Sequence, residues 1–200
     1  MPPRKTARIV DTARELFLER GYDGTSLDDV AAQSGVSKTT VYNNFDDKEA
    51  LFHAVIRDVA GRASAIVDSV TATLDAPGTV EERLRSAAEQ LAAGVLTPVV
   101  VQLRRLAIAE ALRFPALVRE YWDQAPGRTI AVLEAAIAAM AREGGLCVPD
   151  VHEAALQLAY SVLGPLQDQA LLRPDEPLDH SAALAHAREA ARRFVRAYAP

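Results

Sequence analysis

Polar side chains fill most of a short segment near the N-terminus, SKTTVYNNFDDK, which runs from Ser37 to Lys48. This segment contains hydroxyl, amide, phenol and ammonium groups and only two apolar residues, Val41 and Phe45, which are four positions apart as on one face of a helix. Threonine methyls can contact thymine methyls and asparagine can pair with adenine, whereas lysine and tyrosine can hold phosphates. This combination predicts contact with a nucleic-acid duplex. The alternative interpretation is a solvated turn between two helices.

The neighbouring residues predict the elements that would position these groups: two short helices joined by a tight turn. Ser26 can cap the first helix, and Gly35 can adopt the left-handed conformation that ends it. Ser37 can then cap the second helix, on which Val41 and Phe45 lie four residues apart and face inward. Two helices joined in this way can present the second one to a major groove. The outward side chains of that helix are Lys38, Thr39, Thr40, Tyr42, Asn43 and Asn44.

A further anion site is expected where the next helix begins. The first-turn amides of that helix and the ammonium of Lys48 make a phosphate site, while Asp46 and Asp47 act as caps. At the start of the chain, Arg4, Lys5 and Arg8 are either a solvated arm or a contact to a phosphate backbone.

Charge argues against a strong non-specific attraction to DNA. The chain has 22 Lys and Arg against 27 Asp and Glu, and residues 1–60 carry eight basic and ten acidic residues, a net charge of 8 − 10 = −2. Affinity for DNA falls with salt in proportion to the number of neutralised phosphates. We therefore expect weak non-specific binding with a shallow salt dependence, and binding that relies on a dimer and a specific site.

The rest of the chain predicts an all-α fold, because apolar residues recur at helical spacing and alternation never persists. Pro and Gly residues mark the breaks that divide the chain into about nine helices. We place these at 4–20, 27–34, 38–45, 48–74, 80–95, 99–113, 116–143 (bent near Pro126), 151–171 and 180–198. The shift from short to long helices predicts a small N-terminal module over 1–47 and a larger helical body over 48–200. The chain has neither an apolar run of membrane-spanning length nor a signal-peptide core, and its single Cys147 cannot form an intramolecular disulfide, so we expect a cytoplasmic protein.

The stretch ARELFLERGYDGTSLDDVAAQSGVSKTTVYNNFDDKEALFHAVI resembles the DNA-binding domain of the TetR family of bacterial transcriptional regulators. The matching positions are Phe17, Gly21, Tyr22, Thr25, Ser26, Ala31, Gly35, Val36, Ser37, Tyr42, Phe45 and Lys48 to Leu51. The resemblance implies a homodimer that places one recognition helix per subunit in a major groove. It implies phosphate contacts at Thr25, Ser26, Tyr42 and Lys48, and base-edge contacts at or near Lys38, Thr39, Thr40, Asn43 and Asn44. Many members have Gly or Ala in place of Thr39 and His in place of Asn44, so the operator sequence does not carry over.

A second resemblance lies in LRRLAIAEALRFPALVREYW, where Glu110-x-x-Arg113-Phe114-Pro115-x-Leu117 is similar to the C-terminal domain of AefR-like members of that family. In the family a ligand cavity lies in this domain. Apolar residues with a few polar ones are the candidate lining, which suits a hydrophobic or aromatic effector. The candidates are Ile66, Leu91, Val95, Leu103, Phe114, Tyr121, Trp122, Leu133, Ile137 and Tyr160. Most of these residues are alternatively plain core.

The resemblance implies that 1–47 is a DNA-binding domain and 48–200 a ligand-binding and dimerisation domain, which pairs through the last two helices, about 151–171 and 180–198. Small residues there, such as Ala155, Ala159, Ala187 and Ala191, would permit close approach. Gly164-Pro165 should bend the first of them, either to make room for ligand or to shape the dimer seam.

Three alternatives remain for the function. The leading hypothesis is a ligand-responsive repressor that needs neither metal nor cofactor. A helical enzyme or carrier with a vestigial N-terminal motif is the rival, but the four histidines are scattered and show no catalytic or metal spacing. An activator is the third.

Overall fold

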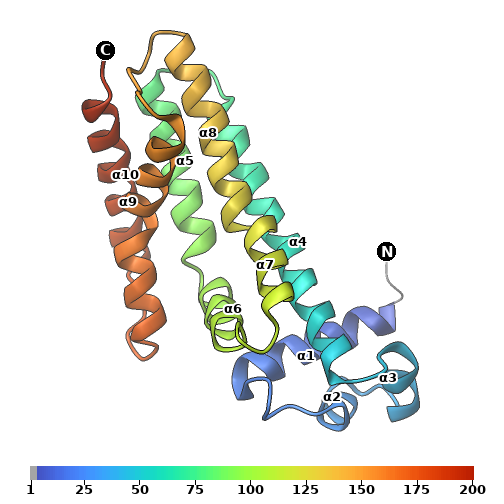
Figure 1. The fold of residues 1–200 in the computed structure, drawn as a ribbon. Helices are drawn as coiled ribbons and strands as arrows, with labels where there is room; N and C mark the ends of the chain where they lie inside the picture. The colour runs from blue at the N-terminus through green and yellow to red at the C-terminus, as the bar shows by residue number, and fades with distance from the viewer. Residues whose placement is uncertain (1–3) are drawn as a thin grey trace. The chain divides into compact units, whose positions relative to one another are not determined.

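The computed structural model describes residues 4–200, apart from the side chain of Arg62. Within these residues the chain forms ten helices and no strand, as Figure 1 shows. They are α1 (Arg4–Arg20), α2 (Leu27–Ser34), α3 (Lys38–Asn44), α4 (Lys48–Leu74), α5 (Val80–Val95), α6 (Pro98–Ala109), α7 (Pro115–Gln124), α8 (Pro126–Arg142), α9 (Val151–Leu172) and α10 (His180–Ala197). The all-α prediction is confirmed.

The segment from 110 to 125 differs most from the sequence-based expectation. The helix expected over 99–113 ends at Ala109, and residues 110–113 form hydrogen-bonded turns. Pro115 disfavours a helical residue before it and itself begins α7, which explains the early stop. The single bent helix expected over 116–143 consists of two helices, and the break falls at Ala125, beside the expected Pro126.

The chain folds into two compact units that do not follow the expected division at residue 47. The N-terminal unit consists of the chain up to Arg62 together with Gln102–Tyr121. Its core combines the buried face of α1, with Ile9 and Phe17, and residues of α4, α6 and α7 such as Phe52. The N-terminal unit is therefore built from two separate stretches of sequence.

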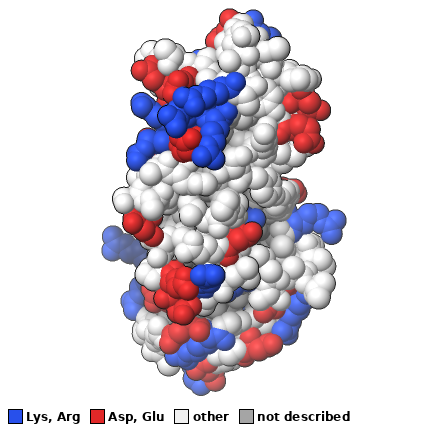
Figure 2. Space-filling view, turned by 90° about the vertical axis from the view of Figure 1, so that its left-hand side faces the viewer, with Lys and Arg blue, Asp and Glu red and all other residues white. Residues whose placement is uncertain are grey.

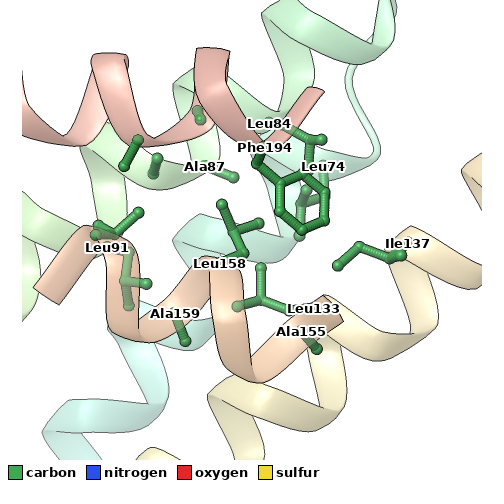
Figure 3. Close-up of a cluster of buried hydrophobic side chains, with 14 of the residues drawn as sticks. Leu74, Leu84, Ala87, Leu91, Leu133, Ile137, Ala155, Leu158, Ala159 and Phe194 are labelled. Carbon is green, nitrogen blue, oxygen red and sulfur yellow. The ribbon is translucent and has the colours of Figure 1, made fainter. Parts of the chain in front are cut away.

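The C-terminal unit contains Ala63–Val101 and Trp122–Pro200. In it α5 packs against α9 and α10, and α9 also packs against α8. Figure 3 shows the apolar side chains of this core, among them Leu91, Leu158 and Phe194, directed toward one another from these helices. Ala155, Ala159, Ala187 and Ala191 are buried here, so these small residues let helices approach within one chain. A dimer seam through these helices stays a prediction.

Side-chain caps define the ends of several helices, which explains why their bounds could be predicted. Thr79 and Glu82 form a reciprocal capping box at the start of α5. Asp150 and Asp179 cap α9 and α10 by accepting hydrogen bonds from first-turn amides. Each cap satisfies amides that have no partner inside the helix. Pro165 lies inside α9, which is assigned as one helix over its whole length.

None of the described helices is by itself long and apolar enough to span a membrane. Among the described residues, only α5 and α6 together reach the necessary length and hydropathy, and they are bent by 67° at the break between them.

Candidate DNA-binding interface

The backbone of the helix-turn-helix is fixed by short local hydrogen bonds. The Ser26 hydroxyl accepts from the amide of Asp29, whose carboxylate in turn accepts from the Ser26 amide at 3.0 Å, so the two residues form a capping box on α2. Gly35 ends α2 with φ +65° and ψ +23°. Ser37 caps α3 by accepting from the amide of Thr40. The expected caps and the left-handed glycine are confirmed.

The turn between α2 and α3 is also held from α1. The guanidinium of Arg8 donates a short hydrogen bond to the backbone carbonyl of Ser34. Arg8 is therefore not a free solvated arm, and the alternative, a contact to a phosphate backbone, stays a prediction. Arg8 ties the first helix to the turn.

The outward side chains of α3 form one exposed polar surface, while Val41 is fully buried beneath it. Lys38, Thr39, Tyr42, Asn43 and Asn44 are exposed and Thr40 is half-buried. Apart from the half-buried Thr40, the predicted base-edge residues therefore all lie exposed on α3, around the buried Val41.

Hydrogen bonds fix two side chains of this surface, Thr40 and Asn44. The Thr40 hydroxyl is 2.8 Å from the Ser37 hydroxyl. The side-chain amide of Asn44 donates to the Thr40 carbonyl at 2.7 Å, and its oxygen accepts from the Thr6 hydroxyl at 2.8 Å. Thr39 and Asn43 are exposed side chains of the same surface.

An acidic side chain of α2 lies against two of the predicted contact residues. Asp28 Oδ2 is 2.9 Å from Lys38 Nζ, and the Tyr42 hydroxyl donates to Asp28 Oδ1 at 3.5 Å. The hydrogen bond and the charge of Asp28 raise the pKa of the Lys38 ammonium above its ordinary value. The sequence alone does not predict this contact, because it depends on how α2 and α3 cross.

The predicted phosphate site at the start of α4 is held by an aromatic residue. Lys48 Nζ donates to the Tyr22 carbonyl at 3.0 Å and lies 4.3 Å from the centre of the Tyr22 ring. Asp47 caps α4 by accepting from the amide of Ala50 at 2.7 Å. The start of α4 therefore combines first-turn amides, one of them used by Asp47, with a positioned ammonium, and phosphate binding there stays a prediction.

One predicted phosphate contact is not at the surface. Thr25 is 2% exposed, and its hydroxyl donates to the Gly21 carbonyl at 3.0 Å in the turn after α1. Its side chain completes that turn, and the neighbouring Ser26 is exposed. The expected contact from the Thr25 hydroxyl is wrong because the turn uses that hydroxyl internally.

The turn before α7 packs onto the same Tyr22 ring. The centre of the Phe114 ring lies 5.0 Å from that of Tyr22, in an edge-on arrangement. The Arg113 guanidinium lies 4.3 Å from the Tyr22 ring centre and is paired with Asp23 at 2.7 Å, which lowers the pKa of the Asp23 carboxyl. Arginine over an aromatic face is a favourable cation–π arrangement. Sequence analysis singled out Arg113 and Phe114 but not their place in the N-terminal unit.

The expected effector-binding residues are divided between the two units. Leu91, Leu133 and Ile137 belong to the C-terminal core, and Val95 packs against it. Leu103, Phe114 and Tyr121 belong to the N-terminal unit, whereas Ile66, Trp122 and Tyr160 belong to the C-terminal one. Trp122 is 42% exposed and Tyr160 55% exposed. Phe114 lies in the core of the N-terminal unit, and the role of these residues in effector binding stays a prediction.

The described residues contain no group of three or more His, Cys, Asp and Glu side chains able to hold a metal ion. Cys147 is exposed. A different polar group stands out in the C-terminal unit: Gln167 is 7% exposed, and its Nε2 has no hydrogen-bond partner in the structure.

Comparison with known proteins identifies the family. Residues 82–200 match the family model of the AefR-like transcriptional repressor C-terminal domain, which is more than half of the chain. Residues 9–55 match the model of bacterial regulatory proteins of the tetR family.

The chain belongs to the TetR family.

Two solved structures of TetR-family type cover nearly the whole chain. A TetR-family transcriptional regulator from Mesorhizobium loti is 30% identical with a TM-score of 0.89, and the match covers 98% of each chain. The flavonoid-responsive regulator FrrA is also 30% identical over 98% of each chain, with a TM-score of 0.72. This TetR-family chain is thus a transcription regulator with a helix-turn-helix DNA-binding domain.

Curated relatives match over shorter segments. The HTH-type regulator YezE of Bacillus subtilis is 33% identical over 81 residues, which cover 40% of this chain and 40% of YezE. The negative regulator IcaR of the biofilm operon icaADBC in Staphylococcus aureus is 40% identical over 50 residues, or 25% of this chain and 27% of IcaR. The matched segments are well under half of these relatives' lengths.

Proposed function

We propose that this TetR-family regulator is a repressor that binds a palindromic operator as a homodimer and leaves it when a small hydrophobic or aromatic molecule binds. The observation that carries the proposal is the polar surface of α3. Its outward side chains are a lysine, two threonines, a tyrosine and two asparagines. A capped helix of this composition can enter a major groove and donate to or accept from base edges.

Repression is favoured over activation by two similarities. The C-terminal family model describes repressors, and IcaR is a negative regulator. A repressor needs only to occupy its operator, which the interface of α3 and the start of α4 supports without any catalytic group.

The effector class is inferred from the composition of the C-terminal unit and from one relative. Its interior is apolar, and the unpaired amide of Gln167 is the buried polar group best suited to anchor a ligand oxygen. An unpaired buried donor costs free energy that a ligand acceptor would recover. FrrA responds to flavonoids, which are aromatic compounds with several oxygens. A molecule of this general class is therefore the first to test.

Dimerisation through α9 and α10 is part of the proposal. α9 exposes two large side chains, Tyr160 at 55% and Leu172 at 81%, which a partner subunit would cover. Figure 2 looks onto the side where Figure 1 shows these helices, and there a group of Lys and Arg surrounds acidic side chains amid uncharged surface. Within α10, Arg192 and Arg193 both pair with Glu189. Internal pairing lowers the repulsion that two copies of this helix would otherwise meet.

Selection of bound DNA from a random pool with the full chain tests the proposal. The expected result is an inverted repeat whose half-sites are about 10–10.5 base pairs, or a multiple, apart.

An Asn43→Ala variant should enrich a different sequence. Lys48→Ala should weaken binding to all sequences alike and flatten the salt slope by about one. Adding flavonoids to the selected complex should release DNA. A pool that shows no enrichment over the input would contradict operator binding.

A further inference from the structure

The carboxylate of Asp28 on α2 lies between two side chains of the DNA-binding surface. Lys38 and Tyr42 are separated by one turn of α3, and each contacts a different oxygen of the same carboxylate, at 2.9 Å and 3.5 Å. All three side chains are close to half exposed or more, so solvent and ligands reach them. A single anion with two oxygens is thus bound by one ammonium and one phenol.

This arrangement matches the chemistry of a phosphate contact. A backbone phosphate offers two non-bridging oxygens, and lysine and tyrosine are among the side chains that bind them. The hydrogen-bonding groups needed for the phosphate are therefore the groups that Asp28 occupies. When DNA arrives, either the carboxylate leaves or two anions share one ammonium.

We propose that Asp28 is an internal competitor for the DNA backbone, which lowers the affinity of the α3 surface for phosphate and makes its salt dependence shallower. The proposal rests on the proposed DNA binding and names a residue that sets its strength. It explains how a module with a net charge of −2 over residues 1–60 limits its attachment to DNA of any sequence. Phosphate contacts carry no sequence information, so the effect applies to operator and unrelated DNA alike.

The size of the effect follows from two general relations. An exposed ion pair of this kind changes an equilibrium by a factor of about two to five. Freeing one ammonium for one phosphate steepens the slope of log affinity against log salt by about 0.9. Between 50 and 200 mM salt that slope amounts to an about 3.5-fold change.

The experiment measures binding of the full-length protein to its selected operator and to a scrambled duplex of equal length, at several salt concentrations. Asp28→Asn should bind both duplexes about two- to fivefold more tightly at low salt. Its advantage should shrink as salt rises. Asp28→Glu keeps the charge and should keep the wild-type slope.

Two controls separate this inference from general electrostatics. Glu15→Gln removes the same charge from an exposed position on α1 and should leave affinity close to wild type. In a Lys38→Met background the gain from Asp28→Asn should largely disappear, because the ammonium that the carboxylate holds is gone. Circular dichroism and a thermal melt of each variant confirm that it is folded.

Three outcomes overturn the inference while leaving DNA binding intact. Unchanged or weaker binding by Asp28→Asn would mean that the carboxylate orients Lys38 and Tyr42 instead. An equal gain in Glu15→Gln would reduce the effect to net charge. A gain restricted to the operator would place Asp28 in base readout. Absence of binding by the wild-type protein to any duplex would contradict the proposed function itself, and the inference with it.

Discussion

Gly94 of α5 lies where the helix approaches α4 within the C-terminal unit. A Cβ atom on Gly94 would lie 2.6 Å from Cγ2 of Ile66 and 3.0 Å from its Cγ1. These two carbons are attached directly to the β-carbon of a branched side chain, so rotation about one bond cannot move both away from α5. We therefore predict that Gly94→Ala is destabilising, even though alanine favours a helix.

The magnitude follows from two opposing contributions. Replacing a glycine by alanine inside a helix stabilises it by about 0.8–1 kcal/mol. Overpacking a well-filled contact costs about 1–3 kcal/mol. The single substitution should therefore lower the free energy of unfolding by about 0–2 kcal/mol. Because this range includes zero, the single substitution does not by itself decide whether the close contact exists.

A double-mutant cycle with Ile66 makes the prediction decisive. Ile66→Ala removes the three atoms nearest to the new methyl, so in that background Gly94→Ala should stabilise by its helix contribution. The coupling energy between the two positions should be about 1–3 kcal/mol. Ile66→Val removes only Cδ1, which lies at 3.2 Å, and should leave most of the clash.

Urea denaturation followed by circular dichroism, at one protein concentration for all variants, measures these differences. Gly61→Ala in α4 is the matched control, because no atom lies within 4 Å of a Cβ at that position. It should stabilise the protein whichever residue is at position 66. Additivity of Gly94→Ala and Ile66→Ala within about 0.5 kcal/mol would refute the close contact.

Two ion pairs predict opposite responses to pH. Arg113 lowers the pKa of the Asp23 carboxyl below its ordinary value of 3.8, so this pair stabilises the fold near neutrality and loses that contribution as the pH falls through the lowered pKa. In Arg113→Gln the Asp23 pKa, measured by NMR titration, should return toward 3.8. Glu134 raises the pKa of His152 above 6.5, so that pair contributes fully below pH 6.5 and loses its contribution as the pH rises through the raised pKa. Glu134→Gln should bring the His152 pKa down, and an unchanged value would contradict the pairing.

The helix bounds were largely predictable because local chemistry sets them. Ser26, Gly35 and Ser37 have the cap and turn geometry that their residue types favour. Pro98 and Pro115 each begin a helix, where a missing amide costs nothing. Such signals act over a few residues, so one sequence suffices to find them.

The composition of the candidate site was predictable only where one helix supplies it. The outward residues of α3 follow from helical periodicity and from the buried Val41. The contact of Asp28 with Lys38 depends on the crossing of two helices, and the burial of Thr25 on the path of a turn. The packing of Phe114 on Tyr22 joins residues more than ninety positions apart, beyond the range of any local pattern.

The discontinuous N-terminal unit has a consequence for synthesis and for recombination. During translation the aromatic cluster of Tyr22 and Phe52 cannot be completed until Phe114 has left the ribosome, so α1 to α3 emerge long before their last core ring is available. A chimera that transfers only the first 62 residues to another body would leave that cluster open on one side. A graft intended to move this DNA-binding unit intact must carry 102–121 with it.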